Sequence, residues 1–177
     1  MIGRATATAL EDERRAAFTR LVDRDLDRAY RLAGVILGNG PDAEDATHDA
    51  VVHAWRSFAG LRDLERFDAW FQRILVNTCR DRLRKHKRTP VTELNVASGV
   101  SVTGDYGSVD DRLALDRAFT RLSPEQAITV VLRFHADLKV EDIAERMGVP
   151  SGTVKSRLHA ALAAMELALA GVEVIDR

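Results

Sequence analysis

The segment from Val140 to Leu162 limits the possible folds of this chain more than any other. It reads VEDIAERMGVPSGTVKSRLHAAL, with apolar residues at helical spacing on both sides of Gly148. This periodicity predicts two helices. Gly148 is the expected end of the first helix, and Ser151 is the expected cap of the second. The small Ala144 lets the two helices cross closely, so the segment predicts a helix-turn-helix.

The second helix of this pair is expected to present a polar face. Val154 and Leu158 would hold the helix on its partner. The opposite side carries the polar residues Thr153, Lys155, Ser156 and His159. Such side chains suit the phosphates and base edges of a DNA major groove. An ordinary helical hairpin in an all-helical domain is the alternative interpretation.

The composition indicates a globular chain with one medium domain or two small ones. It has 177 residues, of which 46% are hydrophobic and 30% charged, and no apolar run long enough to span a membrane. Residues 1–13 lack the apolar core of a signal peptide and are predicted to be a disordered lead, so a cytoplasmic location is expected. The single Cys79 excludes an internal disulfide and a cysteine-rich zinc site.

The charge is unevenly distributed although the net charge is only -1. Between Val76 and Arg88 the basic residues are Arg80, Arg82, Arg84, Lys85, Lys87 and Arg88, against the single acid Asp81. Acids gather near residues 11–13 and 42–49. This asymmetry favours one nucleic-acid face and another surface that meets a different partner. A solvated helix end with a basic last turn is the simpler alternative.

Helical periodicity accounts for the rest of the first half. We expect one bent helix or two helices from Glu11 to about Leu37, a helix from Pro41 to about Phe58, and another from Arg66 through Leu83. The predicted first domain is residues 14–88. Phe67, Trp70 and Phe71 are expected in its core, although aromatic side chains can also stack on bases.

The second half begins with a change of amino-acid composition. Residues 89–109 are rich in Thr, Ser, Gly and Val without helical periodicity, which predicts a flexible linker, with a short strand pair as the alternative. Residues 110–171 predict a domain of four helices. Ser123 and Pro124 mark the start of its second helix, which should end between His135 and Leu138. Residues 172–177 form a short tail. The predicted fold class is all-α.

These residues together resemble an extracytoplasmic-function (ECF) sigma factor of bacterial RNA polymerase. The likeness covers about residues 14–167. It rests on DAEDATHDAVVHAWRSF, AWFQRILVNTCRDRLR and GVPSGTVKSRLHAA, which follow one another in the family's order. The resemblance implies a transcription initiation factor that binds core RNA polymerase, directs it to promoters and assists DNA melting. It implies no catalytic residue, metal, cofactor, membrane or small-molecule substrate.

The resemblance also assigns roles in the first domain. The helix at residues 42–58 would dock on the clamp helices of the beta-prime subunit through Asp45, Asp49, Val52, Trp55 and Arg56. A tryptophan at helical spacing is also a common core residue, so Trp55 keeps that alternative. An unstacked minus-ten base would enter a pocket at Ile74, Asn77 and Asp81, with the loop at residues 60–64 as a lid. Arg80, Arg84, Lys85 and Arg88 would hold the phosphates of that strand.

In the second domain the resemblance assigns the minus-thirty-five element to the helix after the tight turn. The matching residues are Pro150, Gly152, Thr153, Lys155, Ser156, Arg157 and His159. The sequence departs from many relatives at Ala160, where a basic residue is frequent, and at Ser151, where an apolar one is common. The first departure removes one expected phosphate contact.

The resemblance further implies that the linker threads through the polymerase. The beta subunit, promoter DNA and an anti-sigma factor are the other implied partners. In such a factor the two domains would be held together only when polymerase or an inhibitor engages them.

Two other classes of protein remain as alternatives. A plain helix-turn-helix regulator would bind its operator without polymerase, usually as a dimer. The basic helix of the first domain argues against this class. An enzyme or metal protein using His48, Asp49 and His53 is less consistent with the spacing, because the two histidines do not share one ligating face.

Overall fold

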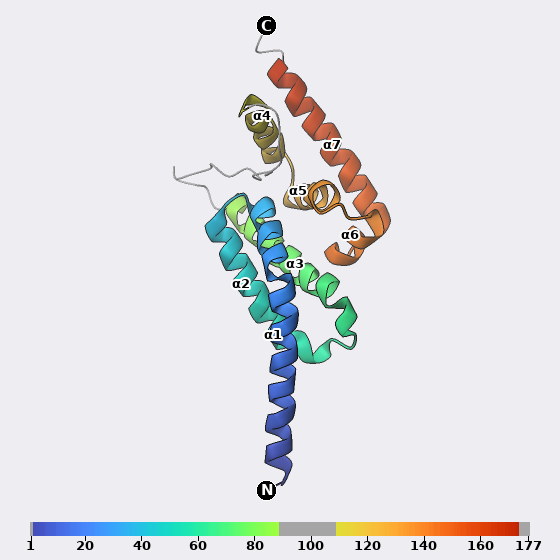
Figure 1. Cartoon of the computed structure of the whole chain (residues 1–177). Coiled ribbons are helices and arrows are strands. Elements are labelled where there is room, and N and C mark those ends of the chain that lie inside the picture. Colours follow the sequence, from blue (N-terminus) through green and yellow to red (C-terminus); the bar gives the residue numbers. More distant parts are fainter. Residues whose placement is uncertain (1, 89–108, 174–177) are drawn as a thin grey trace.

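The structure is a computed structural model that describes the backbone of residues 2–88 and 109–173 and the side chains of residues 10–86 and 113–170. Within these ranges all regular structure is helical (Figure 1). The first half contains α1 (Ile2–Leu37), α2 (Gly40–Ser57), the 3₁₀ turns η1 (Phe58–Gly60) and η2 (Leu64–Arg66), and α3 (Phe67–Arg88). The second half contains α4 (Val109–Thr120), α5 (Pro124–Val130), the π-helical turn η3 (Val131–His135), α6 (Val140–Met147) and α7 (Ser151–Glu173). The all-α prediction is confirmed.

The first half is a bundle of three helices. Four alanines of α2 are completely buried, which lets α1 and α3 pack closely against it: Ala43, Ala46, Ala50 and Ala54. Beyond them Phe18, Phe58 and Phe67 meet edge to face, with ring centroids 5.1 to 6.1 Å apart. Phe67 and Phe71 are fully buried, so both belong to the core as predicted, whereas Trp70 is half-buried.

The helix boundaries of this bundle follow from local sequence. Gly38 has a left-handed φ of 77°, which ends α1, and Asn39 then caps α2 by accepting a hydrogen bond from the backbone N–H of Asp42 at 2.8 Å. The start of α1 differs from the expectation. It begins at Ile2, so the disordered lead predicted over residues 1–13 is wrong for residues 2–13, which continue the helix without a break.

The second half contains the predicted helix-turn-helix. Gly148 adopts φ 65° and closes α6 by donating its backbone N–H to the carbonyl of Glu145. Ile143 of α6 and Val154 of α7 are fully buried between the two helices. Ser151 is the first residue of α7 and not its cap; the backbone N–H groups of Thr153 and Val154 donate to the carbonyl of Pro150 instead.

A capping box at Ser123 starts α5 as expected, with Gln126 as its partner. The predicted linker at residues 89–109 lies outside the described residues except for Val109, the first residue of α4. The predicted tail at residues 172–177 is described only for its first two residues, which are helical.

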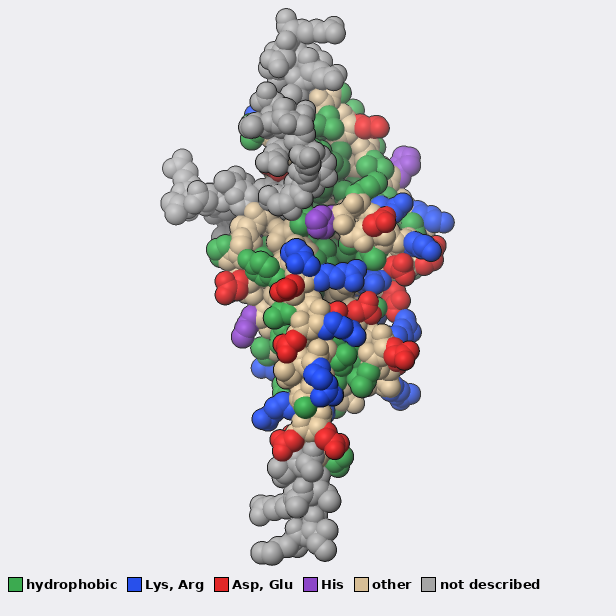
Figure 2. Space-filling view, in the orientation of Figure 1, with side chains coloured by type: hydrophobic (Ala, Val, Ile, Leu, Met, Phe, Trp, Pro, Cys, Tyr) green, Lys and Arg blue, Asp and Glu red, His purple; other side chains and the backbone are tan. Residues whose placement is uncertain are grey.

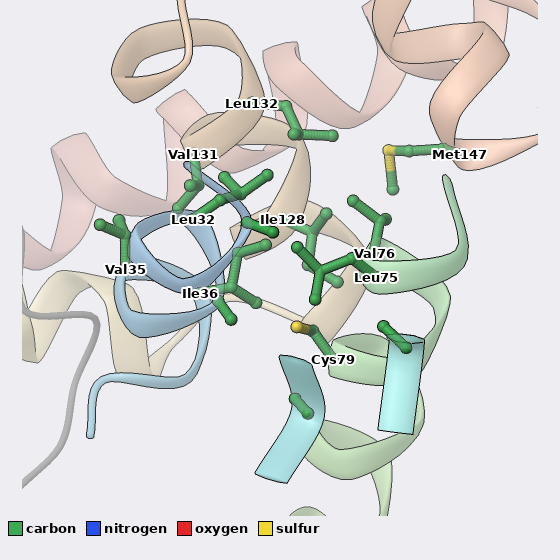
Figure 3. Close-up of a cluster of buried hydrophobic side chains, with 14 of the residues drawn as sticks. Leu32, Val35, Ile36, Leu75, Val76, Cys79, Ile128, Val131, Leu132 and Met147 are labelled. Atoms are coloured by element: carbon green, nitrogen blue, oxygen red, sulfur yellow. The ribbon is translucent and has the colours of Figure 1, made fainter. Parts of the chain in front are cut away.

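The two domains pack directly against each other. Figure 3 shows one apolar cluster shared by α1, α3, α5, η3 and α6. Its labelled members include Ile36, Leu75, Val76, Ile128 and Met147. The structure therefore corrects the expectation that the domains are held together only by polymerase or an inhibitor, because their own apolar faces cover one another.

Candidate polymerase and promoter contacts

A polar pocket of about 540 Å³ lies between α2 and α3. It brings together four residues of the predicted minus-ten set from α3: Ile74, Asn77, Asp81 and Lys85. The wall from α2 consists of Asp49, His53 and Ser57. The loop at residues 60–64, the expected lid, does not contribute to this lining. His53 and Ser57 were not predicted as members of this site, because only folding places their helix opposite Asn77.

The pocket offers hydrogen-bonding groups of several kinds. The Asn77 amide supplies both a donor and an acceptor, and the exposed Asp81 carboxylate supplies acceptors. Figure 2 shows Lys and Arg side chains across the middle of the face drawn, with Asp and Glu among them. Such a mixture can bind the edge of a base and its phosphate together.

Arg82 also lines this pocket, with Thr78 and His86, and all three were missing from the predicted site. Its guanidinium lies 2.6 Å from a carboxylate oxygen of Asp49, 3.5 Å from one of Asp45 and 3.8 Å from one of Asp42. Burial opposes the charge of Arg82, but the hydrogen bond with Asp49 and the three carboxylates outweigh it and raise its pKa. Two of the acids predicted to contact polymerase are thus already paired within the domain.

The other predicted polymerase contacts lie along α2. Val52 is half-buried and Arg56 is exposed. Trp55 is half-buried: its ring meets Phe18 at 5.1 Å, and the guanidinium carbon of Arg14 lies 4.9 Å from the ring centroid. Trp55 is therefore not wholly in the core.

The remaining basic residues of α3 have different surroundings. Arg84 forms an ion pair with Glu125 of α5, with its Nε 2.9 Å from the carboxylate. Arg80 is half-buried, 3.9 Å from Asp81. The side chain of Arg88 lies outside the described residues.

The predicted minus-thirty-five residues lie at the start of α7 and in the turn before it. Five of them are exposed: Pro150, Gly152, Lys155, Ser156 and His159. Thr153 and Arg157 are half-buried, and the Ser156 hydroxyl donates to the carbonyl of Thr153 at 3.0 Å. Folding therefore leaves the polar face of α7 open to solvent while Val154 is buried behind it.

Comparison with known proteins identifies both domains. Residues 21–89 match the family model described as Sigma-70 region 2, and residues 112–165 match Sigma-70, region 4. The chain is 36% identical over 143 residues to the ECF RNA polymerase sigma factor SigM of Mycobacterium tuberculosis, covering 81% of this chain and 72% of that protein. The chain belongs to the ECF sigma factor family.

This sigma factor resembles other members at similar levels. It is 36% identical over 142 residues to the RNA polymerase sigma factor SigV of Bacillus subtilis, which covers 79% of this chain and 83% of that protein. As a member of the family it directs RNA polymerase to promoters and is a non-catalytic subunit of that enzyme. The predicted function is confirmed, and the region 2 match separates the sigma factor from a plain helix-turn-helix regulator.

Solved structures share the fold of this sigma factor. RpoE in complex with the anti-sigma factor NepR from Bartonella quintana matches with a TM-score of 0.64 and 23% identity, over 86% of this chain and 96% of that one. CnrH in complex with the cytosolic domain of CnrY matches with a TM-score of 0.61 and 22% identity, over 89% and 90% of the two chains. Where the structure describes the sigma factor, none of its helices is long and apolar enough to cross a membrane.

Proposed function

We propose that the pocket between α2 and α3 takes one unstacked base of the non-template strand at the minus-ten element. The observation that carries this proposal is that Ile74, Asn77 and Asp81, a turn apart along α3, line one hollow with Lys85. Asn77 and Asp81 would meet the edge of the base. Lys85, Arg80 and Arg84 would meet the phosphates, and we extend this role to Arg88 at the end of the helix.

The polar face of α7 is proposed to read the duplex minus-thirty-five element. The exposed Lys155, Ser156 and His159 would reach base edges in the major groove, with Pro150, Gly152 and Thr153 at the entry of the helix. Arg157 would contact a phosphate. A base-edge contact by Lys155 would contribute about 1 to 3 kcal/mol to discrimination between bases.

The outer side of α2 is proposed to dock on the clamp helices of the polymerase beta-prime subunit. Val52, Trp55 and Arg56 would form the centre of this contact. Asp45 and Asp49 would join it at the edge, where Arg82 holds their carboxylates in place. This action would place the chain in the bacterial cytoplasm, where core polymerase and promoter DNA meet.

A second polymerase contact is proposed in the other domain. An apolar hollow of about 280 Å³ lies between α4, α5, η3 and α7 of this domain and Val35 of α1, and Phe119, Phe134 and Leu162 are part of its lining. Phe134 is 61% exposed, which is unusual for a large aromatic residue and suits a protein partner. We assign this hollow to the beta subunit. An anti-sigma factor is a further proposed partner, because RpoE, which shares this fold, was solved in complex with the anti-sigma factor NepR.

Run-off transcription with core polymerase tests these assignments. We expect initiation at a small set of promoters that depends on the protein. Asn77→Ala and Lys155→Ala should each reduce the transcripts at least tenfold, about 1.4 kcal/mol, while binding to core polymerase is kept. Arg121→Ala, which removes an exposed charge next to α4, serves as the matched control for Lys155. Unchanged transcription by both variants would contradict the proposed DNA contacts.

A further inference from the structure

The surface between the two domains carries charged contacts that the proposed function does not use. Arg84 of α3 pairs with Glu125 of α5, and Arg66 beside α3 pairs with Glu145 of α6. In the third contact, Arg146 of α6 donates to the Gln72 side chain at 2.7 Å. In the first two contacts the arginine belongs to the first domain and the carboxylate to the second. Of the two carboxylates, that of Glu125 faces a residue proposed to hold DNA, Arg84.

Glu125 has the most direct relation to promoter binding. It lies in the first turn of α5, directly after Pro124, and its side chain is 20% exposed. Its carboxylate accepts a hydrogen bond from Arg84 Nε at 2.9 Å. A carboxylate and a phosphate occupy a guanidinium in the same way, through oxygens facing its N–H groups. Arg84 cannot present that edge to both at once.

The electrostatics of Glu125 agree with this geometry. Burial acts to raise its pKa, but its own backbone N–H, the hydrogen bond from Arg84 and the charges of Arg84 and Arg157 outweigh burial and lower the pKa. Arg157 is itself a proposed phosphate contact of α7. One carboxylate is thus stabilised by a guanidinium from each of the two proposed DNA-binding faces.

We propose that Glu125 is an internal competitor of promoter DNA, which occupies Arg84 in the free chain and releases it only when α5 leaves α3. This inference rests on the proposed role of Arg84 as a phosphate contact. It assigns to a residue of region 4 a regulatory effect on strand binding by region 2.

The spacing of the two promoter elements requires that Arg84 is released from Glu125. Their centres are about 25 base pairs apart, or roughly 85 Å along B-DNA at about 3.4 Å per pair. In the structure the turn of the helix-turn-helix touches α3: a Cβ added to Gly148 would lie 3.0 Å from the Arg73 guanidinium. The two readers must therefore separate before one chain can bind both elements, and separation breaks the pair of Arg84 with Glu125.

The apolar cluster in Figure 3 limits how much one substitution can do. Leu75 and Val76 of α3 pack in it with Ile128 of α5, and this contact remains when the charge of Glu125 is removed. Glu125→Gln should accordingly free Arg84 without unfolding or fully separating the domains. We expect a shift in DNA affinity and not an on-off change.

The test measures binding of fluorescein-labelled random 12-nucleotide single-stranded DNA to the full-length chain without polymerase, at low salt. Glu125→Gln should tighten binding about threefold, the size of one solvent-accessible ion pair. Glu166→Gln, an exposed site on α7 with the same change of charge, should have less than half this effect. Adding Arg84→Ala to Glu125→Gln should abolish the gain.

The outcomes separate this inference from the proposed function. An equal gain for Glu125→Gln and Glu166→Gln would reduce the effect to net charge and overturn the inference. No gain for Glu125→Gln, together with weaker binding of forked minus-ten DNA by an Arg84→Ala holoenzyme, would overturn it while the proposed role of Arg84 stands. If the Arg84→Ala holoenzyme binds forked DNA as well as the unsubstituted one, both the role of Arg84 and this inference fail.

Discussion

Arg146 of α6 donates a hydrogen bond from Nε to the side-chain oxygen of Gln72 on α3, 2.7 Å away, and both residues are buried. Arg146 also donates to the carbonyl of Asp142 at 3.2 Å, and Asp68 lies 4.0 Å from it. A guanidinium that is only 7% exposed needs such acceptors, because a buried charge without partners is costly. This contact therefore ties the helix-turn-helix to the first domain.

Gln72→Leu keeps the approximate size of the side chain and removes the acceptor. The loss of a hydrogen bond to a charged group should weaken the contact between the domains by about 1.5 to 3 kcal/mol. Small-angle scattering should show a larger radius of gyration for this variant. Arg20→Ala, at an exposed site on α1, is the control that should leave the radius unchanged. A compact Gln72→Leu variant would contradict the role of the contact.

The lowered pKa of Glu125 gives the domain contact a dependence on pH. A carboxyl group whose pKa is lower in the packed state stabilises that state above its ordinary value, about 4.3, and this stabilisation is lost as pH falls through the lowered pKa. The free energy of unfolding of the unsubstituted chain should therefore fall over this acidic range. The Glu125→Gln variant should lack this pH-dependent loss of stability. Identical pH profiles for the two proteins would exclude a contribution from Glu125.

Arg82 is expected to stabilise the first domain. Removing it would leave Asp42, Asp45 and Asp49 close together without their shared cation. Arg82→Ala should lower the free energy of unfolding by about 1 to 2 kcal/mol, a modest value because solvent screens partly exposed pairs. Urea unfolding measures the change. Arg62→Ala, an exposed arginine in the loop before α3, should change it by less than about 0.5 kcal/mol.

The tight turn of the helix-turn-helix depends on Gly148. Its φ of 65° is unfavourable for a side chain, and an added Cβ would also lie 3.0 Å from the Arg73 guanidinium. Gly148→Ala should therefore destabilise the second domain by about 1 to 2 kcal/mol. Gly148→Asn should cost less from the backbone, because Asn tolerates this conformation. Equal thermal stability of the Ala variant and the unsubstituted protein would contradict this account.

Burial raises the pKa of Cys79 to about 12, despite the nearby charge of Arg82. The thiolate is the reactive form, so alkylation of the native protein at about pH 8 should be far slower than that of the urea-unfolded chain. The raised pKa also predicts that stability falls as pH rises from the ordinary thiol value, about 8.5, towards 12. Rapid alkylation of the native protein would show that Cys79 is accessible.

The helix-turn-helix could be predicted because its signals are local. Gly148 and the apolar positions of α6 and α7 each act within a few residues of the chain, and so do Ser123 and Pro124 at the start of α5. The same holds for α2, whose predicted start at Pro41 is one residue from the observed one. The residues proposed to contact the minus-ten element were nominated through resemblance, and four of them, Ile74, Asn77, Asp81 and Lys85, line one pocket because of their helical spacing on α3.

The contacts between distant segments could not be predicted in this way. Periodicity shows that Leu75 and Ile128 lie on apolar helix faces, but it does not show that these faces cover each other. The pairing of Arg82 with three acids of α2 depends on the crossing of two helices, and the pairing of Arg84 with Glu125 depends on the packing of two domains. A run of charged residues indicates a charged surface, but it does not show which other residues of the same chain form ion pairs with it.

The four alanines of α2 have a consequence for which of its residues can be exchanged. They present almost no side-chain shape to α1 and α3, and Ala43 lies only 4.0 Å from where a Cβ of Gly34 would be. The inward side of α2 is thus formed mostly by small side chains, while the residues proposed to contact polymerase lie on its outward side. Substituting only the outward residues should therefore change partner binding without disturbing the packing of α2 on α1 and α3.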